Sequence, residues 1–316
     1  MKIVILDGNT VNPGDIDWKP LERLGDITYY PRTSPYEVVK RSKGASILII
    51  SKILMNKEVI EQLPDLKYIG VIATGYNVVD IKFAKEKGIV VTNVPDYCSG
   101  SVAQMVFAHI LNFARGVGHY TTEVRNGSWA TAEDFCYWNT NQIELDNKVL
   151  GLIGFGTIGI KVARIALSME MKVIAFDPYS KGAPGVSLVD LDSVFKQSDF
   201  LSLHCPLNPE TNHIINSKNL SKMKKSAFII NTGRGPLVKS DDLAKALNEG
   251  VIGGAGLDVL EVEPPRDDNP LIHAKNCYFT PHLGWASREA RIRLVKIVAD
   301  NLAAFQAGNP INVVNK

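Results

Sequence analysis

The sequence predicts an α/β protein with two Rossmann-like, doubly wound parallel-sheet domains and a cleft between them. Short apolar runs alternate with helix-like stretches, this alternation occurs twice along the chain, and the second series begins with a glycine-rich turn. Such alternation is typical of a parallel sheet flanked by helices. At 316 residues the chain is long enough for two domains, each with its own core.

The first series of runs lies within residues 2–92 and contains no glycine fingerprint. We therefore assign it to a flavodoxin-like substrate domain. Its helix-like stretches include 36–43, 57–63 and 80–87. Its strand-like runs are Lys2–Leu6, Ile27–Tyr30, Ile47–Ile50, Tyr68–Ile72 and Ile89–Thr92.

One long helix is predicted over Ser99–Arg125, with apolar residues on nearly all of its faces. A helix that is apolar all round is expected to be buried on more than one side. An irregular segment up to residue 147 follows and holds four aromatic side chains, at Trp129, Phe135, Tyr137 and Trp138. This segment is either a loop over the protein's own core or, equally, an arm that docks on a partner chain. Residues 99–147 together favour a homodimer. We expect Trp138 to pack rather than to reach a neighbouring active site.

The second series surrounds a turn of the form GxGxxG at Gly154, Gly156 and Gly159. The first glycine permits the turn, the second lets the backbone approach a pyrophosphate, and the third lets the helix pack closely on the strand. Asp177 ends the next apolar run, eighteen residues beyond Gly159, where a carboxylate accepts hydrogen bonds from an adenosine ribose. Because this carboxylate would repel a 2′-phosphate and no Arg follows it directly, the pattern predicts NAD rather than NADP.

Six runs of the parallel type occur in this series, which suits a dinucleotide-binding sheet. They are Lys148–Ile153, Lys172–Phe176, Phe200–Leu203, Ala227–Asn231, Gly253–Leu257 and Cys277–Thr280.

The last element predicted is a C-terminal helix that begins after Ser287 and stops before Gly308 and Pro310. Its apolar face contains Leu294, Val298, Leu302 and Phe305. We expect it to return to the first domain. The substrate domain would then comprise residues 1–98 and 285–316, and the dinucleotide-binding domain residues 99–284.

Composition excludes several classes of protein. A formal net charge of +2 lacks the basic bias of a nucleic-acid binder. The four cysteines form no CxxC pair, so neither a metal site nor a disulfide framework is expected. The N-terminal apolar run is too short for a signal peptide, and no stretch approaches a membrane span. We expect a cytoplasmic location.

Three ionisable residues follow strand-like runs of the second series: Arg234, Glu263 and His282. Ligands of an open α/β sheet bind beyond the carboxyl ends of its strands, so these side chains are expected at the cofactor edge. An imidazolium suits proton donation to a ketone oxygen during hydride transfer. A carboxylate at its other ring nitrogen would hold the tautomer, and a guanidinium would bind a substrate carboxylate.

The motifs that contain these residues resemble the D-2-hydroxyacid dehydrogenase family, and within it most closely the glycerate dehydrogenases, also called hydroxypyruvate reductases. The resemblance covers nearly the whole chain. It rests on the glycine turn with Asp177 and on the segments 73–80, 134–138, 204–207, 231–235, 256–264 and 280–284.

The resemblance implies a dimeric, two-domain enzyme that reduces hydroxypyruvate or glyoxylate with NADH, giving D-glycerate or glycolate. It implies that Arg234, Glu263 and His282 are catalytic. It implies cofactor contacts from Gly154, Phe155, Gly156, Thr157, Ile158, Gly159, Asp177, His204, Cys205, Pro206, Thr211, Thr232, Arg234, Asp258, His282 and Gly284. Substrate contacts are implied for Thr74, Gly75, Tyr76, Arg234 and His282.

Lys52, within Ser51–Ile53, stands where relatives often carry another polar or basic residue beside the substrate. It would either pair with a substrate carboxylate or phosphate, or remain a solvated lysine after a strand, which is the reading we favour. Of the remaining histidines, we expect structural or exposed positions for His109, His119, His204, His213 and His273.

Several alternatives share the fold. Glu263 argues against a formate dehydrogenase, which would pair its histidine with glutamine. Many phosphoglycerate dehydrogenases add a C-terminal regulatory domain, whereas this sequence stops at Lys316, so we expect a different member of the family. D-lactate dehydrogenase and D-3-phosphoglycerate dehydrogenase stay open, since a few side chains decide the substrate. A non-enzymatic, NAD-binding corepressor is the alternative from another class, although the chain lacks long low-complexity tails.

Overall fold

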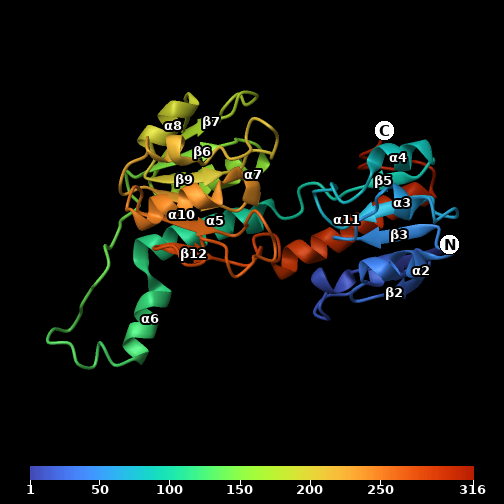
Figure 1. Ribbon diagram of the computed structural model, residues 1–316, viewed down its shortest axis with the longest axis horizontal. Helices are drawn as coiled ribbons and strands as arrows, with labels where there is room; N and C mark the ends of the chain where they lie inside the picture. Colours follow the sequence, from blue (N-terminus) through green and yellow to red (C-terminus); the bar gives the residue numbers. More distant parts are fainter. The chain divides into compact units, whose positions relative to one another are not determined.

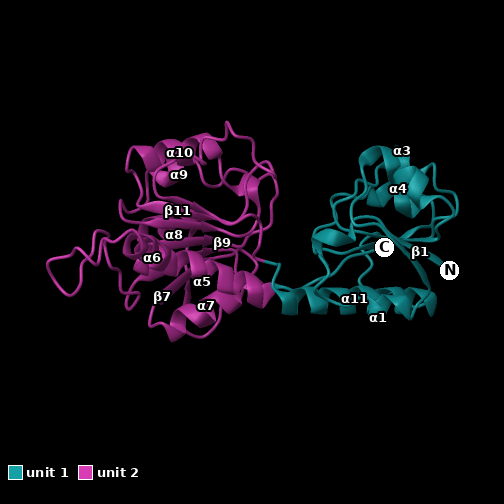
Figure 2. Ribbon diagram, turned by 90° about the horizontal axis from the view of Figure 1, so that it is seen from below, with its two compact units in different colours: residues 1–98, 285–316 teal, residues 99–284 magenta.

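The computed structural model describes residues 1–316 and divides into two compact units (Figure 2). Unit 1 comprises residues 1–98 and 285–316, and unit 2 comprises residues 99–284. Each unit contains one wholly parallel sheet with its own helices (Figure 1). No helix combines the length and the apolar character needed to cross a membrane.

The sheet of unit 1 has five strands in the order β2-β1-β3-β4-β5, which is the flavodoxin-like arrangement. The strands are β1 (Lys2–Ile5), β2 (Asp26–Tyr29), β3 (Ile47–Ile50), β4 (Tyr68–Val71) and β5 (Val90–Thr92). All five predicted runs therefore form strands. The helices are α1 (Lys19–Glu22), α2 (Val38–Ser42), α3 (Lys57–Ile60), α4 (Ile81–Glu86) and α11 (Arg288–Gln306).

The C-terminal helix α11 packs in unit 1, although the whole of unit 2 separates it from β5 in the sequence. The Ser287 hydroxyl accepts a hydrogen bond from the Ala290 amide at 3.3 Å and caps the helix. Leu294 is fully buried, and the Phe305 ring lies 4.7 Å from the ring of Tyr68 in β4. The apolar face of α11 thus completes the core of unit 1.

The sheet of unit 2 has seven strands in the order β12-β11-β10-β9-β6-β7-β8. Read from β8, this is the dinucleotide-binding order 3-2-1-4-5-6 with one further strand at its end. The strands are β6 (Val149–Ile153), β7 (Lys172–Phe176), β8 (Val186–Leu188), β9 (Phe200–Leu203), β10 (Phe228–Asn231), β11 (Gly254–Leu257) and β12 (Cys277–Phe279). The helices are α5 (Ser99–Arg115), α6 (Val117–Arg125), α7 (Thr157–Ser168), α8 (Leu191–Gln197), α9 (Ser217–Leu220) and α10 (Ser240–Asn248).

The six predicted runs of this series all form strands, but β8 is a seventh strand that the sequence analysis missed. It has three residues, and none of them is buried, so no apolar run marks it. Hydrogen bonding to β7 alone places it at the edge of the sheet.

The prediction of one helix over Ser99–Arg125 is wrong. Gly116 adopts a left-handed conformation with φ of +57°, which ends α5 and starts α6 as a separate helix. No residue of α6 is buried. The segment after α6 extends away from the rest of unit 2 (Figures 1 and 2).

Trp138 does not pack within its own chain. This side chain is 70% exposed, and Phe135 is 90% exposed. The indole N–H of Trp129 donates to the Phe135 carbonyl at 2.9 Å, so local hydrogen bonds rather than a core hold this segment.

Candidate active site

The glycine turn connects β6 to α7 and depends on close backbone contacts. Gly154 has φ of +93°, and a Cβ atom there would lie only 2.7 Å from the carbonyl oxygen of His204. A Cβ atom on Gly159 would lie 2.6 Å from the Gly154 carbonyl oxygen. At Gly156, by contrast, a Cβ atom would meet nothing within 4 Å. The open space beside Gly156 suits a phosphate that approaches the backbone.

Asp177 follows β7 and holds the glycine turn. Its Oδ2 accepts a hydrogen bond from the Phe155 amide at 2.7 Å, and its Oδ1 accepts one from the Tyr179 amide at 2.9 Å. A carboxylate oxygen has more than one acceptor site. Asp177 therefore retains capacity for the two hydroxyls of an adenosine ribose while it fixes the turn.

Thr232 follows β10, and its Oγ1 is a buried polar atom without a hydrogen-bond partner. Buried hydroxyls in native proteins are nearly always hydrogen-bonded, so this atom points to a missing ligand. Together with the open space at Gly156 and the carboxylate of Asp177, it fits a dinucleotide at the carboxyl edge of the sheet.

The turn after β9 contains His204, Cys205, Pro206 and Thr211. His204 Nε2 lies 2.9 Å from the buried Ser202 hydroxyl, and desolvation lowers the pKa of His204 to about 4. Burial raises the pKa of Cys205 to about 11, so its thiol stays protonated at neutral pH. Thr211 Oγ1 donates to the Pro206 carbonyl at 2.6 Å and closes the turn. His204, Cys205 and Thr211 are therefore uncharged at neutral pH.

The three predicted catalytic residues follow β10, β11 and β12, which are adjacent strands of the sheet. The paired last residues of these strands show that they end together, with Asn231 opposite Leu257 and Leu257 opposite Phe279. The loops that carry Arg234, Glu263 and His282 thus leave the same edge of unit 2.

His282 and Glu263 form an ion pair or hydrogen bond of 2.6 Å between Nδ1 and Oε2. Because an ionised carboxylate only accepts, Nδ1 carries a proton and Nε2 is the nitrogen available to a substrate. The second oxygen of Glu263, Oε1, accepts a hydrogen bond from the Leu260 amide at 3.1 Å. Both side chains are about one-third exposed, which leaves the pair accessible.

The buried carboxylate of Asp258 shapes the loop that presents His282. Its oxygens accept hydrogen bonds from the Thr280 hydroxyl at 2.5 Å and from the Leu283 and Gly284 amides at 2.8 Å. The His282 amide donates to the Asp258 carbonyl at 2.8 Å, and His282 itself has φ of +55°. These bonds hold His282 in a backbone conformation that a side-chain-bearing residue rarely adopts.

A histidine of α5 supports the same loop, in a structural role as predicted. The Nε2 of buried His109 lies 3.2 Å from the Thr280 hydroxyl. Desolvation lowers the pKa of His109, more than the charge of Asp258 raises it. A neutral imidazole therefore packs behind the loop.

The Arg234 loop depends on Asn231, whose contribution the sequence analysis missed. The fully buried Asn231 side chain donates to the Arg234 carbonyl at 2.9 Å and accepts from the Gly233 amide at 3.0 Å. Asn231 was visible in the motif, but only the folded loop shows that its amide closes the turn. The Arg234 side chain is exposed, and its Nη1 donates to the Gly233 carbonyl at 2.9 Å.

The predicted substrate residues of unit 1 lie in the loop after β4. The Thr74 hydroxyl donates to the Val94 carbonyl at 2.9 Å, and the Asn93 side chain donates to the Thr74 carbonyl at 2.7 Å. The Gly75 and Tyr76 amides donate no hydrogen bond within the chain. Two neighbouring free amides can bind a carboxylate.

Lys52 lies in the loop after β3, which is fixed by Asp7. The Asp7 carboxylate accepts hydrogen bonds from the Ser51 amide at 2.7 Å and from the Lys52 amide at 2.6 Å. Burial raises the pKa of Asp7, and the two amide hydrogen bonds oppose this shift. The Lys52 residue itself is exposed, so its backbone is held and its ammonium is solvated.

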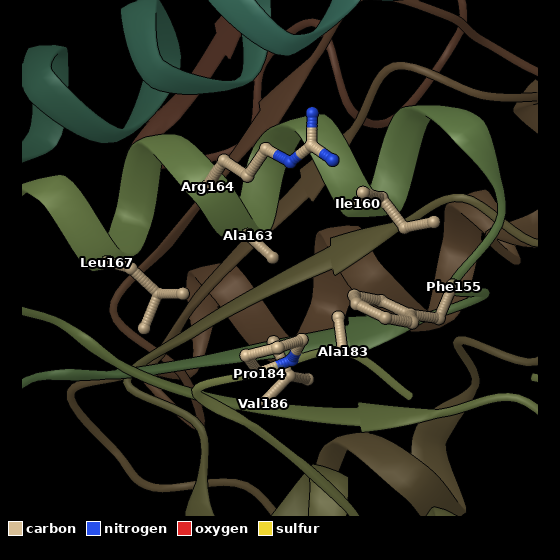
Figure 3. Close-up of a pocket in the computed structure, with 8 residues that line it drawn as sticks. All are labelled: Phe155, Ile160, Ala163, Arg164, Leu167, Ala183, Pro184 and Val186. Carbon is tan, nitrogen blue, oxygen red and sulfur yellow. The ribbon is translucent and has the colours of Figure 1, made fainter. Parts of the chain in front are cut away.

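A cavity of about 290 Å³ lies between α7 and residues 183–186 (Figure 3). Phe155 of the glycine turn forms one wall, while Arg164 is the charged residue among the apolar side chains of the lining. None of Arg234, Glu263 or His282 lines it. The cavity is therefore separate from the loops that carry the ionisable triad.

Comparison with known families identifies the group to which this arrangement belongs. The model of the D-isomer specific 2-hydroxyacid dehydrogenase NAD-binding domain matches residues 107–284, more than half of the chain and all within unit 2. The chain belongs to the D-isomer specific 2-hydroxyacid dehydrogenase family. It is accordingly an NAD-dependent oxidoreductase, as the motifs predicted.

Known relatives cover the whole chain. It is 48% identical to a hydroxypyruvate reductase of Blautia hydrogenotrophica over 322 aligned positions, which cover 100% of both proteins. It is 43% identical to a glycerate dehydrogenase of Methylorubrum extorquens, with 90% of each protein covered.

Solved structures show the same fold. The TT0316 protein from Thermus thermophilus superimposes with a TM-score of 0.88 at 32% identity, covering 99% of this chain and 100% of that one. A D-lactate dehydrogenase with NAD⁺ from Lactobacillus jensenii gives a TM-score of 0.84 at 27% identity, with 100% of both chains covered. The two parallel-sheet units of this dehydrogenase are therefore those of its family.

Proposed function

We propose that this dehydrogenase reduces hydroxypyruvate or glyoxylate to D-glycerate or glycolate. The observation that carries the chemistry is the 2.6 Å contact between His282 and Glu263 beside the Arg234 loop. The choice of substrate is supported by the two relatives named above.

NADH, when bound, supplies the hydride that adds to C2 of the keto acid. His282 donates a proton from Nε2 to the ketone oxygen, so the oxygen ends as a hydroxyl. Glu263 holds Nδ1–H and stabilises the imidazolium before the proton leaves. The reverse reaction uses the same groups, with His282 as the base.

Arg234 binds the substrate carboxylate, since a guanidinium offers paired donors to two carboxylate oxygens. We also assign the free amides of Gly75 and Tyr76 to this carboxylate, with Thr74 as the residue that fixes their loop. The exposed Lys52 ammonium remains solvated in this proposal. Unit 1 is thus proposed as the substrate domain.

For NADH we propose a site formed by the glycine turn, Asp177 and the turns after β9 and β10. The turn residues Phe155, Thr157 and Ile158, the β9 turn residues and Thr232 would contact the cofactor. Asp258 and Gly284 would act mainly through the loop that they hold, because the structure already engages the Asp258 carboxylate with that loop.

The substrate assignment is tested by the loss of NADH absorbance with four acids: hydroxypyruvate, glyoxylate, pyruvate and phosphohydroxypyruvate. We expect the highest kcat/KM with hydroxypyruvate. A preference for pyruvate or the phosphorylated acid would replace the substrate and keep the reaction class. A protein that binds NADH and oxidises it with none of the four would favour a non-enzymatic NAD-binding module.

We further propose a cytoplasmic homodimer whose contact includes residues 99–147. The support is the cluster of exposed apolar side chains in this segment, which includes Val117, Trp129, Phe135 and Trp138. Light scattering should give twice the chain mass for the wild type and a lower mass for a Phe135→Ser, Trp138→Ser variant. A wild type with the mass of one chain would contradict the dimer.

A further inference from the structure

The loops that carry Arg234 and Glu263 are in direct backbone contact in unit 2. Gly235 lies against the carbonyl of Leu260, so closely that a Cβ atom on Gly235 would collide with it. Leu260 in turn donates its amide to Glu263 Oε1 at 3.1 Å. A movement of either loop therefore displaces the other.

His213 bonds to both loops. Its amide donates to the Pro236 carbonyl at 2.8 Å, two residues beyond Arg234. Its Nε2 lies 2.8 Å from Glu261 Oε1, two residues before Glu263. Its φ of +53° is rare for a residue with a side chain, so the surrounding bonds select this conformation.

Glu261 uses its other oxygen to bind the start of α10. Oε2 accepts a hydrogen bond from the Ser240 amide at 3.1 Å and another from the Ser240 hydroxyl. Burial opposes ionisation of Glu261, but the bonds from Ser240 and His213 outweigh burial and keep its pKa below the usual value. The carboxylate is thus bonded from two sides.

We infer that His213 and Glu261 are positioning residues that fix the Arg234 and Glu263 loops relative to each other. The inference rests on the proposed function, since it deepens the roles of Arg234 and Glu263. Neither residue of the pair needs to contact substrate. Each acts through the loop to which it is bonded.

The exposure of the two side chains indicates that the His213–Glu261 pair orients the loops more than it stabilises the folded protein. The His213 and Glu261 side chains are 36% and 29% exposed. Ion pairs that are this accessible to water contribute little to folding. Small displacements of catalytic groups, however, reduce rates strongly.

The variants are chosen for backbone and hydrogen-bond compatibility. His213→Asn removes the contact and suits the positive φ, because Asn tolerates the left-handed region. His213→Gln keeps an N–H donor that reaches toward Glu261. Glu261→Ala removes the acceptor, and Glu261→Gln keeps one. His273→Asn is the matched control, since His273 is an exposed histidine of the same unit.

The measurements are kcat and KM for the best keto acid, the Kd of NADH from fluorescence, and the midpoint of thermal unfolding. For His213→Asn and Glu261→Ala we expect kcat/KM to fall about tenfold, with kcat lowered and KM raised. The Kd of NADH should stay at the wild-type value in both variants, and so should the midpoint of His213→Asn. Glu261→Ala also leaves the Ser240 amide and hydroxyl without their acceptor, so its midpoint is compared with that of Glu261→Gln. His213→Gln and Glu261→Gln should retain activity to within about threefold, and His273→Asn should match the wild type.

The double variant His213→Asn, Glu261→Ala tests whether the two residues act through the same contact. If they do, kcat/KM of the double variant should fall no further than that of the more impaired single variant. Additive losses would overturn the inference. So would wild-type activity in both single variants, or a loss of activity matched by weaker NADH binding and a lower midpoint. If His213→Asn does not fold, Glu261→Ala and Glu261→Gln decide. An inactive wild type would overturn the proposed function and this inference with it.

Discussion

Glu263 Oε2 lies 2.6 Å from His282 Nδ1, while Glu263 Oε1 accepts the Leu260 amide. The carboxylate is therefore oriented by its own loop before it orients the imidazole. This arrangement leaves Nε2 as the ring nitrogen that would donate a proton in the proposed mechanism. It also leaves the imidazole dependent on a single charged partner.

Glu263→Gln tests that dependence. The amide can still accept the Nδ1–H hydrogen bond, but it no longer stabilises the imidazolium by charge. A hydrogen bond to a charged group is worth about 1.5–3 kcal/mol and a neutral one about 0.5–1.5 kcal/mol, so we expect kcat to fall roughly 5- to 10-fold. Steady-state kinetics with saturating NADH measures the change. Unchanged kcat would remove Glu263 from the mechanism.

Arg234→Ala and His282→Ala should fail in different ways. Loss of the guanidinium removes a carboxylate contact worth roughly 2–5 kcal/mol, which should appear mainly as a higher KM for the keto acid. Loss of the imidazole removes the proton donor, which should lower kcat by roughly 10²–10⁴-fold. Arg234→Lys should restore only part of the affinity, because an ammonium lacks the planar pair of donors. Small and equal effects for both alanine variants would contradict these roles.

Asp177 should decide between the two nicotinamide cofactors. In the proposed site, its carboxylate would repel a 2′-phosphate and accept hydrogen bonds from ribose hydroxyls. Asp177→Ser should therefore weaken NADH and raise the NADPH to NADH ratio of kcat/KM by about tenfold or more. Because Asp177 also holds the Phe155 amide, the Kd of NADH should rise as well. An unchanged ratio would show that another residue selects the cofactor.

Much of this molecule could be predicted from the sequence because its parallel strands are buried and read as apolar runs. Once the strands are located, their carboxyl ends mark the ligand-binding edge of the sheet. The glycine turn and the residues after β10, β11 and β12 could therefore be predicted too. β8 escaped prediction because none of its residues is buried. The break at Gly116 escaped because this isolated glycine was read as part of one helix-like stretch, and only its left-handed φ ends the helix.

The contacts that hold the site could not be predicted. His213 meets Glu261, 48 residues away in sequence, and Asn231 closes a turn by its side chain. No periodicity links such residues, because the pairing depends on how separate loops pack beyond the strand ends. The same holds for Trp138, whose exposure reflects the course of one extended segment rather than its composition.

His204 should make the protein sensitive to mild acid. Its pKa in the folded protein is about 4 because its imidazole is desolvated, whereas a solvated histidine has a pKa of about 6.5. Between about pH 6.5 and about pH 4, His204 therefore binds a proton in the unfolded chain but not in the folded chain. The free energy of unfolding is therefore highest above about pH 6.5 and falls as the pH drops toward the pKa of the folded state.

The measurement that checks this is urea unfolding of wild type and His204→Gln at about pH 7.5 and about pH 5. Glutamine places an amide near the position of Nε2 and can keep the bond to Ser202 without titrating. Between the two pH values, the wild type should lose up to about 2 kcal/mol more than the variant. Other histidines and the carboxylates titrate in both proteins and cancel in this difference. Equal losses would show that the His204 imidazole takes up its proton in the folded state as readily as in the unfolded one.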